Sequence, residues 1–440
     1  MKIFIVGLVK LGTKYGGGEL YIQNLVYGLR DRGHVLTYFY ISFSDNSFPS
    51  LTKQVVNGLE EMELSLPKDW LKKDNHSLQE SILEKIHTIL SAVKPDLLHA
   101  HGLKDCACMA AAREDIPCIV TAHHGGIVCP AGALLNANDA ICRIQANDNA
   151  CLKCCTRSIP GWRFWFPLIK IIPLKARLWL GKWLRRLPFI FFVTPLGTLS
   201  CNIRDKMKVV LDIGHYANKI IAPSPAIAEA LVRNGIPEQK IKILSHGISL
   251  PQRQPLRSDF GTEPLRFLFV GRISYGKGLH IMLKAFSQLP SEKYVLHIVG
   301  GAVKKGEKRY EAQLKRKYAS VNAVWHGTRP YEEIAGHIAW CDIMLHPTVC
   351  LEVFGLNIAE SLAVGRLVIA TRCGGAEAQI HEGKNGFLIP PNDPGALRDR
   401  LLNCIENPLI LKEMSAQAVL VNSLDHHISE LEAVYQECLK

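Results

Sequence analysis

The sequence contains no apolar run of the roughly 18 residues that a membrane-spanning helix requires. Residues 1–7 form a short apolar run that ends in glycine and has no small-residue cleavage site, which predicts a first strand rather than a signal peptide. Internal repeats and low-complexity tracts are also missing. We therefore expect a globular protein of the cytoplasm, and its 440 residues suit two domains of roughly 200 residues each.

Acidic residues are missing from one stretch of the chain. From Asn149 to Arg204 there are ten Lys or Arg residues and no Asp or Glu, so this stretch supplies ten of the twelve net positive charges. The basicity of the protein is therefore local. The fourteen cysteines, in a chain without a secretory signal, favour reduced thiols or a metal site over a disulfide scaffold.

Apolar runs that alternate with helical patterns predict an α/β protein with parallel sheets. In the N-terminal half we expect a strand at Lys2–Val6, a helix at Glu19–Arg32 closed by Gly33, and strands at Asp96–His101 and Cys118–His123. The second half is expected to repeat this order, with strands at Lys219–Pro223, Ile241–Leu244, Phe267–Val270, Val295–Val299, Ile343–His346 and Leu367–Thr371. Residues 129–198 fit neither sheet, so we expect an insertion there. In such a fold the site lies at the carboxyl ends of the strands.

Two carboxylates eight positions apart, Glu352 and Glu360, stand where a strand is followed by a helix. A helix that starts near Phe354 or Gly355 offers unpaired backbone N–H groups to a diphosphate, and Gly355 allows close approach. Glu360, inside that helix, can accept hydrogen bonds from two ribose hydroxyls. An isolated pair of this kind is more often two surface glutamates on an ordinary helix.

A glycine-bounded loop with two cations follows the expected strand at Phe267–Val270. It runs from Gly271 to Gly278 and contains Arg272 and Lys277, which can neutralise a departing diphosphate without a metal. The spacing also matches a P-loop, but Gly278 stands where that motif needs Ser or Thr to hold Mg²⁺. We therefore prefer a metal-independent nucleotide-sugar site.

With the C-G-G-A-E run at 373–377 and the G-K-N-G run at 383–386, these motifs resemble the donor domain of glycosyltransferase family 4. The likeness covers essentially the whole chain; it departs at Ala376, where members commonly have proline. It implies the GT-B architecture, with two Rossmann-like domains facing a cleft and a retaining reaction. The domains expected from it are an acceptor-side domain at 1–215, a donor domain at 216–415 and a closing helix at 416–440 that packs back on the first domain.

The resemblance also implies roles for individual residues. His123, after an expected strand, lies beside the transferred sugar and stabilises positive charge at its anomeric carbon; His99 and His101 are as easily structural. Glu352 contacts the donor sugar. The other expected donor-binding positions are Gly17, Gly18, Gly271, Arg272, Lys277, Phe354, Gly355, Leu356 and Glu360. The triple glycine at 16–18 has no G-x-G-x-x-G spacing, which excludes the dehydrogenase fingerprint, and by itself it is also compatible with a flexible turn.

Five of the fourteen cysteines lie between Cys129 and Cys155. Four thiolates, from Cys129, Cys142, Cys151 and Cys154, can close a structural zinc site or hold an iron–sulfur cluster, and the sequence does not separate the two. Buried cysteines without metal remain an alternative, because the spacing is looser than in a standard zinc ribbon.

Four of the seven tryptophans fall among the cations of the segment Trp162–Val193. This composition is typical of a helix that lies in the interface of an anionic membrane. Nucleic acid is a poor alternative partner, since it favours aromatic residues on a folded platform. A core helix would not carry so many cations.

We conclude from the sequence that the chain is a retaining, metal-independent hexosyltransferase. Its expected partners are a nucleotide diphosphate sugar, a lipid-linked or glycan acceptor, and the cytoplasmic face of a membrane to which it attaches peripherally. Two alternatives stay open: a nucleotide-sugar 2-epimerase of the same fold, and a sugar-nucleotide-binding scaffold without turnover. The nucleotide base, the sugar and the linkage do not follow from the sequence.

Overall fold

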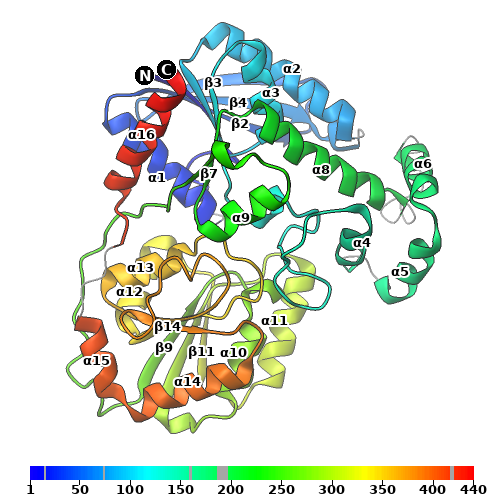
Figure 1. Ribbon diagram of the computed structural model, residues 1–440. Helices are drawn as coiled ribbons and strands as arrows, with labels where there is room; N and C mark the ends of the chain where they lie inside the picture. The colour runs from blue at the N-terminus through cyan, green and yellow to red at the C-terminus, as the bar shows by residue number, and fades with distance from the viewer. Residues whose placement is uncertain (14–15, 73–74, 158–160, 186–196, 417–420) are drawn as a thin grey trace. The chain divides into compact units, whose positions relative to one another are not determined.

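The computed structural model describes residues 1–13, 16–72, 75–157, 161–185, 197–416 and 421–440. These residues form two compact units (Figure 1). The first unit contains Met1–Gly132, Arg143–Ser245 and Leu424–Lys440, and the second contains Ala133–Cys142 and His246–Ser423. Among the described residues, no helix is both long enough and apolar enough to cross a bilayer.

An eight-stranded sheet with the order β3-β4-β2-β1-β5-β6-β7-β8 is the centre of the first unit. Its strands are β1 Lys2–Val6, β2 Val35–Ser44, β3 Ser50–Val56, β4 Leu59–Pro67, β5 Leu97–Ala100, β6 Cys118–Thr121, β7 Lys219–Ala222 and β8 Ile241–Ile243. All neighbours pair in parallel except β3 and β4, which form a hairpin. Asn57 and Gly58, at the hairpin turn, have φ values of 52° and 76°, as a two-residue type I′ turn requires.

The helices of the first unit are α1 Gly17–Asp31, α2 Asn75–Val93, α3 Lys104–Arg113, α4 Asp148–Thr156, α5 Trp162–Ile171, α6 Leu174–Arg185, α8 Leu199–Tyr216, α9 Pro225–Arg233 and α16 Leu424–Leu439. Helix α16 packs beside α1 (Figure 1). Arg32, which follows α1, forms ion pairs with Asp425 and Glu432 of α16. Residues 424–439 are thereby part of the first unit's structure.

The second unit contains a parallel six-stranded sheet with the order β11-β10-β9-β12-β13-β14. Its strands are β9 Leu265–Val270, β10 Tyr294–Val299, β11 Ala323–Gly327, β12 Ile343–His346, β13 Leu367–Thr371 and β14 Gly386–Ile389. Its helices are α10 Leu279–Phe286, α11 Lys305–Lys317, α12 Tyr331–Trp340, α13 Leu356–Val364, α14 Pro394–Glu406 and α15 Pro408–Ala416.

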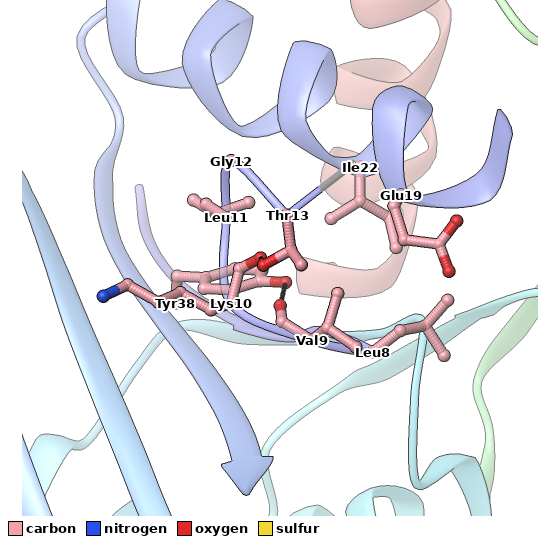
Figure 2. Close-up of a pocket in the computed structure, with 9 residues that line it drawn as sticks. All are labelled: Leu8, Val9, Lys10, Leu11, Gly12, Thr13, Glu19, Ile22 and Tyr38. Atoms are coloured by element: carbon pink, nitrogen blue, oxygen red, sulfur yellow. Dashed lines mark hydrogen bonds between the residues drawn. The ribbon is translucent and has the colours of Figure 1, made fainter. Parts of the chain in front are cut away.

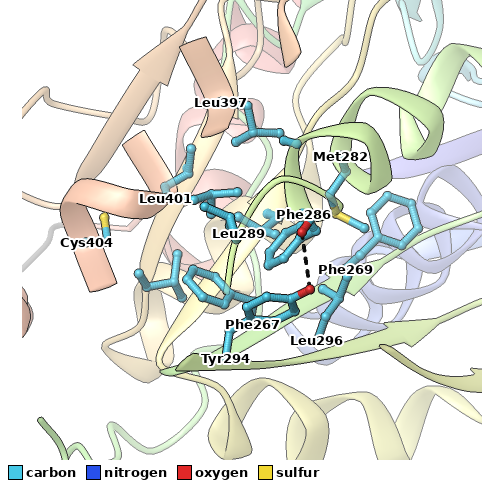
Figure 3. Packing of buried hydrophobic residues seen from close by; sticks show 14 of the residues in the cluster. Phe267, Phe269, Met282, Phe286, Leu289, Tyr294, Leu296, Leu397, Leu401 and Cys404 are labelled. Carbon is cyan, nitrogen blue, oxygen red and sulfur yellow. Dashed lines mark hydrogen bonds between the residues drawn. The ribbon is translucent and has the colours of Figure 1, made fainter. Parts of the chain in front are cut away.

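One face of this second sheet carries an aromatic core, shown in Figure 3. Phe267 and Phe286 pack edge to face with ring centroids 5.3 Å apart, and the Tyr294 hydroxyl donates to the Phe286 carbonyl at 3.3 Å. The inner strands are mostly apolar because helices cover both faces of a parallel sheet. This packed core holds the loops at the carboxyl ends of β9 and β12 in place.

The structure corrects the expected domain boundary at 215/216. Strands β7 and β8 extend the first sheet, because β7 pairs with β6 and β8 pairs with β7, so the first unit continues to Ser245. The described part of 129–198 contains no strand of either sheet and forms α4, α5 and α6. Residues 133–142 of this segment belong to the second unit.

Candidate functional site

The loop after β9 holds Lys277 in a short 3-10 turn, Tyr275–Lys277. Gly278 follows with a φ of 71°, and a Cβ atom there would lie 1.7 Å from the Pro347 carbonyl oxygen. Only glycine fits this position, because both the backbone conformation and the contact exclude a side chain. A P-loop needs Ser or Thr here to hold Mg²⁺, so the structure argues against a P-loop NTPase.

Lys277 and Glu352 form an ion pair between the β9 loop and the segment after β12. Their side chains are 30% and 17% exposed. His346, the buried last residue of β12, lies 3.4 Å from the same Glu352 oxygen. Burial alone would raise the pKa of Glu352, but Lys277 and His346 outweigh it and hold this pKa below its ordinary value. Burial likewise opposes the charge of Lys277, whose pKa Glu352 raises. Both groups are therefore ionised at neutral pH.

Backbone contacts fix the position of Glu352. Its N–H donates to the Cys373 carbonyl at 2.7 Å, and its carbonyl accepts from Gly375 at 2.9 Å. The motif at 373–377, singled out in the sequence, thus holds the backbone of Glu352 and thereby positions its carboxylate. His346, which also contacts Glu352, was not predicted, because in the sequence it is simply the last residue of an apolar strand.

Helix α13 begins after Gly355, whose φ of 86° is in the left-handed region. The Phe354 side chain is buried against Ile248 and Ala359, and Leu356 packs against the same small cluster. Phe354 is therefore an interior side chain, and Leu356 is partly buried beside it. The backbone N–H groups at the start of α13 are unpaired, as at any helix N-terminus, and can attract phosphate.

Glu360 lies on α13 and accepts a hydrogen bond of 2.8 Å from the hydroxyl of Tyr331, the first residue of α12. Burial raises the pKa of Glu360, and the Tyr331 hydroxyl partly offsets that effect. One carboxylate oxygen is thus used by Tyr331, and the other is available for a ligand hydroxyl. Tyr331 was not predicted from the sequence.

Arg272 differs from Lys277 in its surroundings. Its side chain is 56% exposed, and its Nε lies 3.7 Å from Glu307 near the start of α11. A cation held this loosely can turn toward an anionic ligand at little cost. Gly271, the residue before it, donates its N–H to the Val299 carbonyl at 3.0 Å and keeps the loop against β10.

In the first unit, His123 follows β6 and its Nε2 lies 2.7 Å from Nδ1 of His101. The Tyr21 ring packs against His123 with centroids 5.3 Å apart. His99 is fully buried between the Thr121 and Tyr435 hydroxyls, at 2.8 and 2.7 Å. Burial lowers the pKa of His99 to about 3, so it is a neutral structural residue. His101 instead positions His123.

Gly17 and Gly18 form the start of α1, and a Cβ atom at Gly18 would meet no other atom within 4 Å. The neighbouring loop 8–13 encloses a small pocket with Glu19, Ile22 and Tyr38 (Figure 2). Its volume of about 10 Å³ matches about one water molecule. The Tyr38 hydroxyl closes it by donating to the Val9 carbonyl at 2.6 Å. This pocket is too small for a nucleotide and does not include either glycine.

All fourteen cysteines are thiols rather than disulfides. Burial and the neighbouring thiols of Cys151, Cys129 and Cys154 raise the pKa of Cys155 to about 12, which places these four cysteines near one another in the first unit. Cys142 belongs to the second unit. Among the described residues, no three cysteine sulfurs lie close enough together to hold one metal ion. A site made of Cys129, Cys142, Cys151 and Cys154 stays a prediction.

Helix α5 packs beside α4, and helix α6 packs beside α8 (Figure 1). Their outward residues share one side of each helix: Phe164, Trp165, Leu168 and Ile171 on α5, and Lys175, Trp179, Lys182 and Trp183 on α6. The end of the segment, including Phe189–Val193, lies outside the described residues.

The positive charge of this region is partly neutralised, contrary to the sequence analysis. Arg185 pairs with Asp205 at 2.6 Å, and Arg204 pairs with Asp148 at 3.2 Å. Both acids lie just outside the acid-free stretch. Arg177 is buried and bonds Asn149 at 3.2 Å. Among the described side chains of α5 and α6, the exposed cations are therefore Lys170, Lys175 and Lys182.

Comparison with known proteins gives two family matches. Residues 253–419 match the family described as Glycosyl transferases group 1, and residues 15–145 match Glycosyltransferase Family 4. A D-inositol 3-phosphate glycosyltransferase of Corynebacterium urealyticum is 31% identical over 178 residues, 38% of this chain and 42% of that protein. The amylovoran biosynthesis glycosyltransferase AmsK of Erwinia amylovora is 28% identical over 230 residues, 48% of this chain and 54% of that protein. The chain thus spans about half the length of these relatives.

Among solved structures, Anabaena HepE in complex with UDP and glucose has a TM-score of 0.65 and 17% identity, covering 99% of both chains. Sucrose-phosphate synthase from Thermosynechococcus elongatus has a TM-score of 0.67 and 17% identity, covering 99% of this chain and 98% of that one. At 17% identity, the likeness to these two structures shows a shared fold.

Proposed function

Because the chain belongs to glycosyltransferase family 4 and has the GT-B fold, we propose that it transfers a hexosyl-type sugar from a nucleotide diphosphate to an acceptor, with retention of anomeric configuration. The observation that carries the proposal is the ion pair of Lys277 and Glu352 between two loops at strand ends, just before helix α13, on which Glu360 accepts from Tyr331. Its relatives include polysaccharide biosynthesis enzymes such as AmsK.

The proposed reaction breaks the bond between the sugar's anomeric carbon and the diphosphate oxygen. The electron pair stays on the diphosphate, an acceptor hydroxyl forms the new bond, and its proton leaves with the diphosphate. Lys277 and Arg272 stabilise the charge that develops on the leaving group, as fixed cations do in other transfer reactions. Glu352, held by Lys277 and His346, contacts the donor sugar. Glu360 binds the ribose. A role for His123, which belongs to the first unit, stays a prediction from the sequence.

A thermal-stability screen with UDP, GDP and ADP tests the donor site first, because a ligand that binds only the folded state stabilises it. UDP is the first candidate, since HepE was solved with UDP and glucose. Labelled sugar should then move from the matching donor to an acceptor in a membrane extract, and EDTA should leave the rate unchanged. Release of an epimerised donor sugar would identify a 2-epimerase instead, and binding without turnover would identify a scaffold.

For the cysteines we propose a structural zinc ion or iron–sulfur cluster, supported by the proximity of Cys129, Cys151, Cys154 and Cys155. Thiolates hold both kinds of centre. Elemental analysis of the purified protein should find zinc or iron that Cys151→Ser and Cys154→Ser reduce. Equal metal content in the wild type and in these variants would overturn this proposal.

We also propose that α5 and α6 attach the enzyme to the surface of an anionic membrane, close to a lipid-linked acceptor. The support is the exposed apolar side of both helices: Phe164, Ile171 and Trp179 are 66%, 79% and 70% exposed. Lys175 and Lys182 lie beside the tryptophans of α6. Aromatic residues mixed with lysines on one helical side are suited to the bilayer interface.

Liposome sedimentation tests this attachment. Binding should rise with the fraction of anionic lipid and weaken with salt. Each lysine near an anionic leaflet contributes about 1 kcal/mol, so Lys175→Gln with Lys182→Gln should weaken partitioning about thirtyfold, and adding Trp179→Ala and Trp183→Ala should abolish it. Lys305→Gln with Lys308→Gln, on exposed positions of α11, removes the same charge elsewhere and should change little. Unaltered sedimentation of the four-residue variant would overturn the proposal.

A further inference from the structure

Three histidines from three different elements gather on one face of the second sheet. His297 is on β10, His326 on β11 and His337 on α12, and one ring nitrogen from each lies within 4.8 Å of the other two. The ring centroids of His297 and His326 are 4.4 Å apart, and those of His326 and His337 are 4.7 Å apart. Among the described residues, no other group of three possible metal ligands is this close.

Local structure explains how these residues meet. The register of β10 and β11 shifts between Ile298, which pairs with Trp325, and Val299, which pairs with Gly327. His326 is the extra residue of this bulge, and bulges commonly redirect a side chain near a site. On α12, His337 and Trp340 are three positions apart and so share one side of the helix. Trp340 stacks on His297 with centroids 3.5 Å apart and an interplanar angle of 4°.

Two nitrogens in this cluster have no partner. Nδ1 of His297 and Nε2 of His326 are buried and make no hydrogen bond. Buried polar atoms are normally paired, and an exception calls for an explanation such as a bound ion. Two such atoms on adjacent imidazoles are therefore a second observation that points to a ligand.

The charged groups that face the three rings are Arg266, which lies over the Trp340 ring, and Arg329, which pairs with Glu333 at 3.8 Å.

We propose that His297, His326 and His337 bind a transition-metal dication, with zinc as the first candidate and a fourth coordination position left to water or another ligand. Three imidazole nitrogens suit zinc, nickel or copper, whereas magnesium and calcium require oxygen ligands. Two nitrogens bound to one tetrahedral zinc are roughly 3.4 Å apart, given Zn–N distances near 2.05 Å. The nitrogens of the cluster lie within 4.8 Å of one another, so the side chains would have to draw closer together to bind one ion.

The metal would join β10, β11 and α12 at the edge of the donor domain. Helix α12 begins with Tyr331, which bonds Glu360, so the metal would also steady a contact of the proposed ribose site. It takes no part in the transfer step itself. The binding site stands independently of the proposed function, because it rests on the histidines alone.

Cobalt and zinc titrations of the untagged, metal-stripped full chain test the proposal. We expect the wild type to bind one more equivalent of Zn²⁺ than His337→Gln, and the difference between their Co²⁺ spectra to show d–d absorption without the thiolate charge-transfer band that a cysteine site produces. His326→Gln and His337→Gln should each weaken this binding at least about tenfold, and Mg²⁺ should not compete.

Two controls keep the test decisive. His381→Gln changes an exposed histidine of the same domain and should bind zinc as the wild type does. His337 is half-buried, so its variant should fold without metal, which circular dichroism can check before titration. If folded His326→Gln and His337→Gln both bind zinc with wild-type stoichiometry and affinity, the three histidines are not a metal site.

Discussion

The pair of Lys277 and Glu352 allows the proposed catalytic role of Lys277 to be separated from its structural role. Lys277→Met keeps the length of the side chain and removes the ammonium, which leaves His346, at 3.4 Å, as the remaining side-chain partner of the Glu352 carboxylate. Breaking a fully buried pair costs about 3–5 kcal/mol. Because these side chains are 30% and 17% exposed, we expect a smaller loss of about 1–3 kcal/mol.

That loss should lower the melting temperature of the domain by roughly 3–10 °C. The effect on transfer should be larger, at least about a hundredfold in kcat, which is the scale for losing one fixed group that stabilises transition-state charge. The double variant Lys277→Met with Glu352→Gln has no unpaired carboxylate. We expect it to recover most of the melting temperature while transfer remains at least a hundredfold below the wild type.

Calorimetry without nucleotide gives the stability, and initial rates at saturating donor give kcat. Lys284→Met, at an exposed position of α10, is the matched control and should change neither quantity. The reasoning is refuted if the double variant recovers transfer together with stability, because Lys277 would then act only as the partner of Glu352. Near-normal turnover in Lys277→Met would refute it as well.

Three further predictions concern other residues. Arg272→Ala should cut transfer about a hundredfold without changing the melting temperature, since its side chain is 56% exposed; an unchanged rate would remove it from the site. Nucleotide affinity should fall as the pH is lowered and Glu360 becomes protonated, because only the carboxylate accepts from both ribose hydroxyls and burial raises its pKa. Calorimetry between neutral and acid pH should show this loss of affinity in the wild type and a smaller loss in Glu360→Gln. Removal of residues 424–440 should unfold the first unit, since Tyr435 bonds buried His99 and Arg32 loses its two acids; limited proteolysis should then cut β1 and α1, and resistance there would contradict the packing.

The sequence predicted the elements whose signal is local. Strands β1, β9 and β13 are continuous apolar runs because both of their faces are covered, and the structure places them within a residue or two of the expected ranges. The β3–β4 hairpin was missed, although Asn57-Gly58 is a strong turn signal. Every residue of β3 but the last is exposed, so its pattern has little apolar content to detect.

What depends on pairing between distant residues could not be predicted. Apolar periodicity identifies β7 and β8 as strands but does not say which sheet they join, so the domain boundary was wrong. The same limit applies within the donor site. Glu352 and Lys277 were predicted from their motifs, whereas His346 and Tyr331 enter the site only through packing of β12 and α12. The histidine cluster was missed because its members are spread over three elements.

Helix α16 has a consequence for the order in which the protein folds. Its Tyr435 and His427 hydrogen-bond to His99 and Tyr21 in the interior of the first unit, yet some 180 residues of the second unit are made before it. Domains made on the ribosome usually fold in the order of their synthesis. Here residues 246–423 can complete their own core while the first unit still lacks helix α16. The half of the protein that is translated first is therefore finished last, and until then its histidine-lined interior is open to chaperones and proteases.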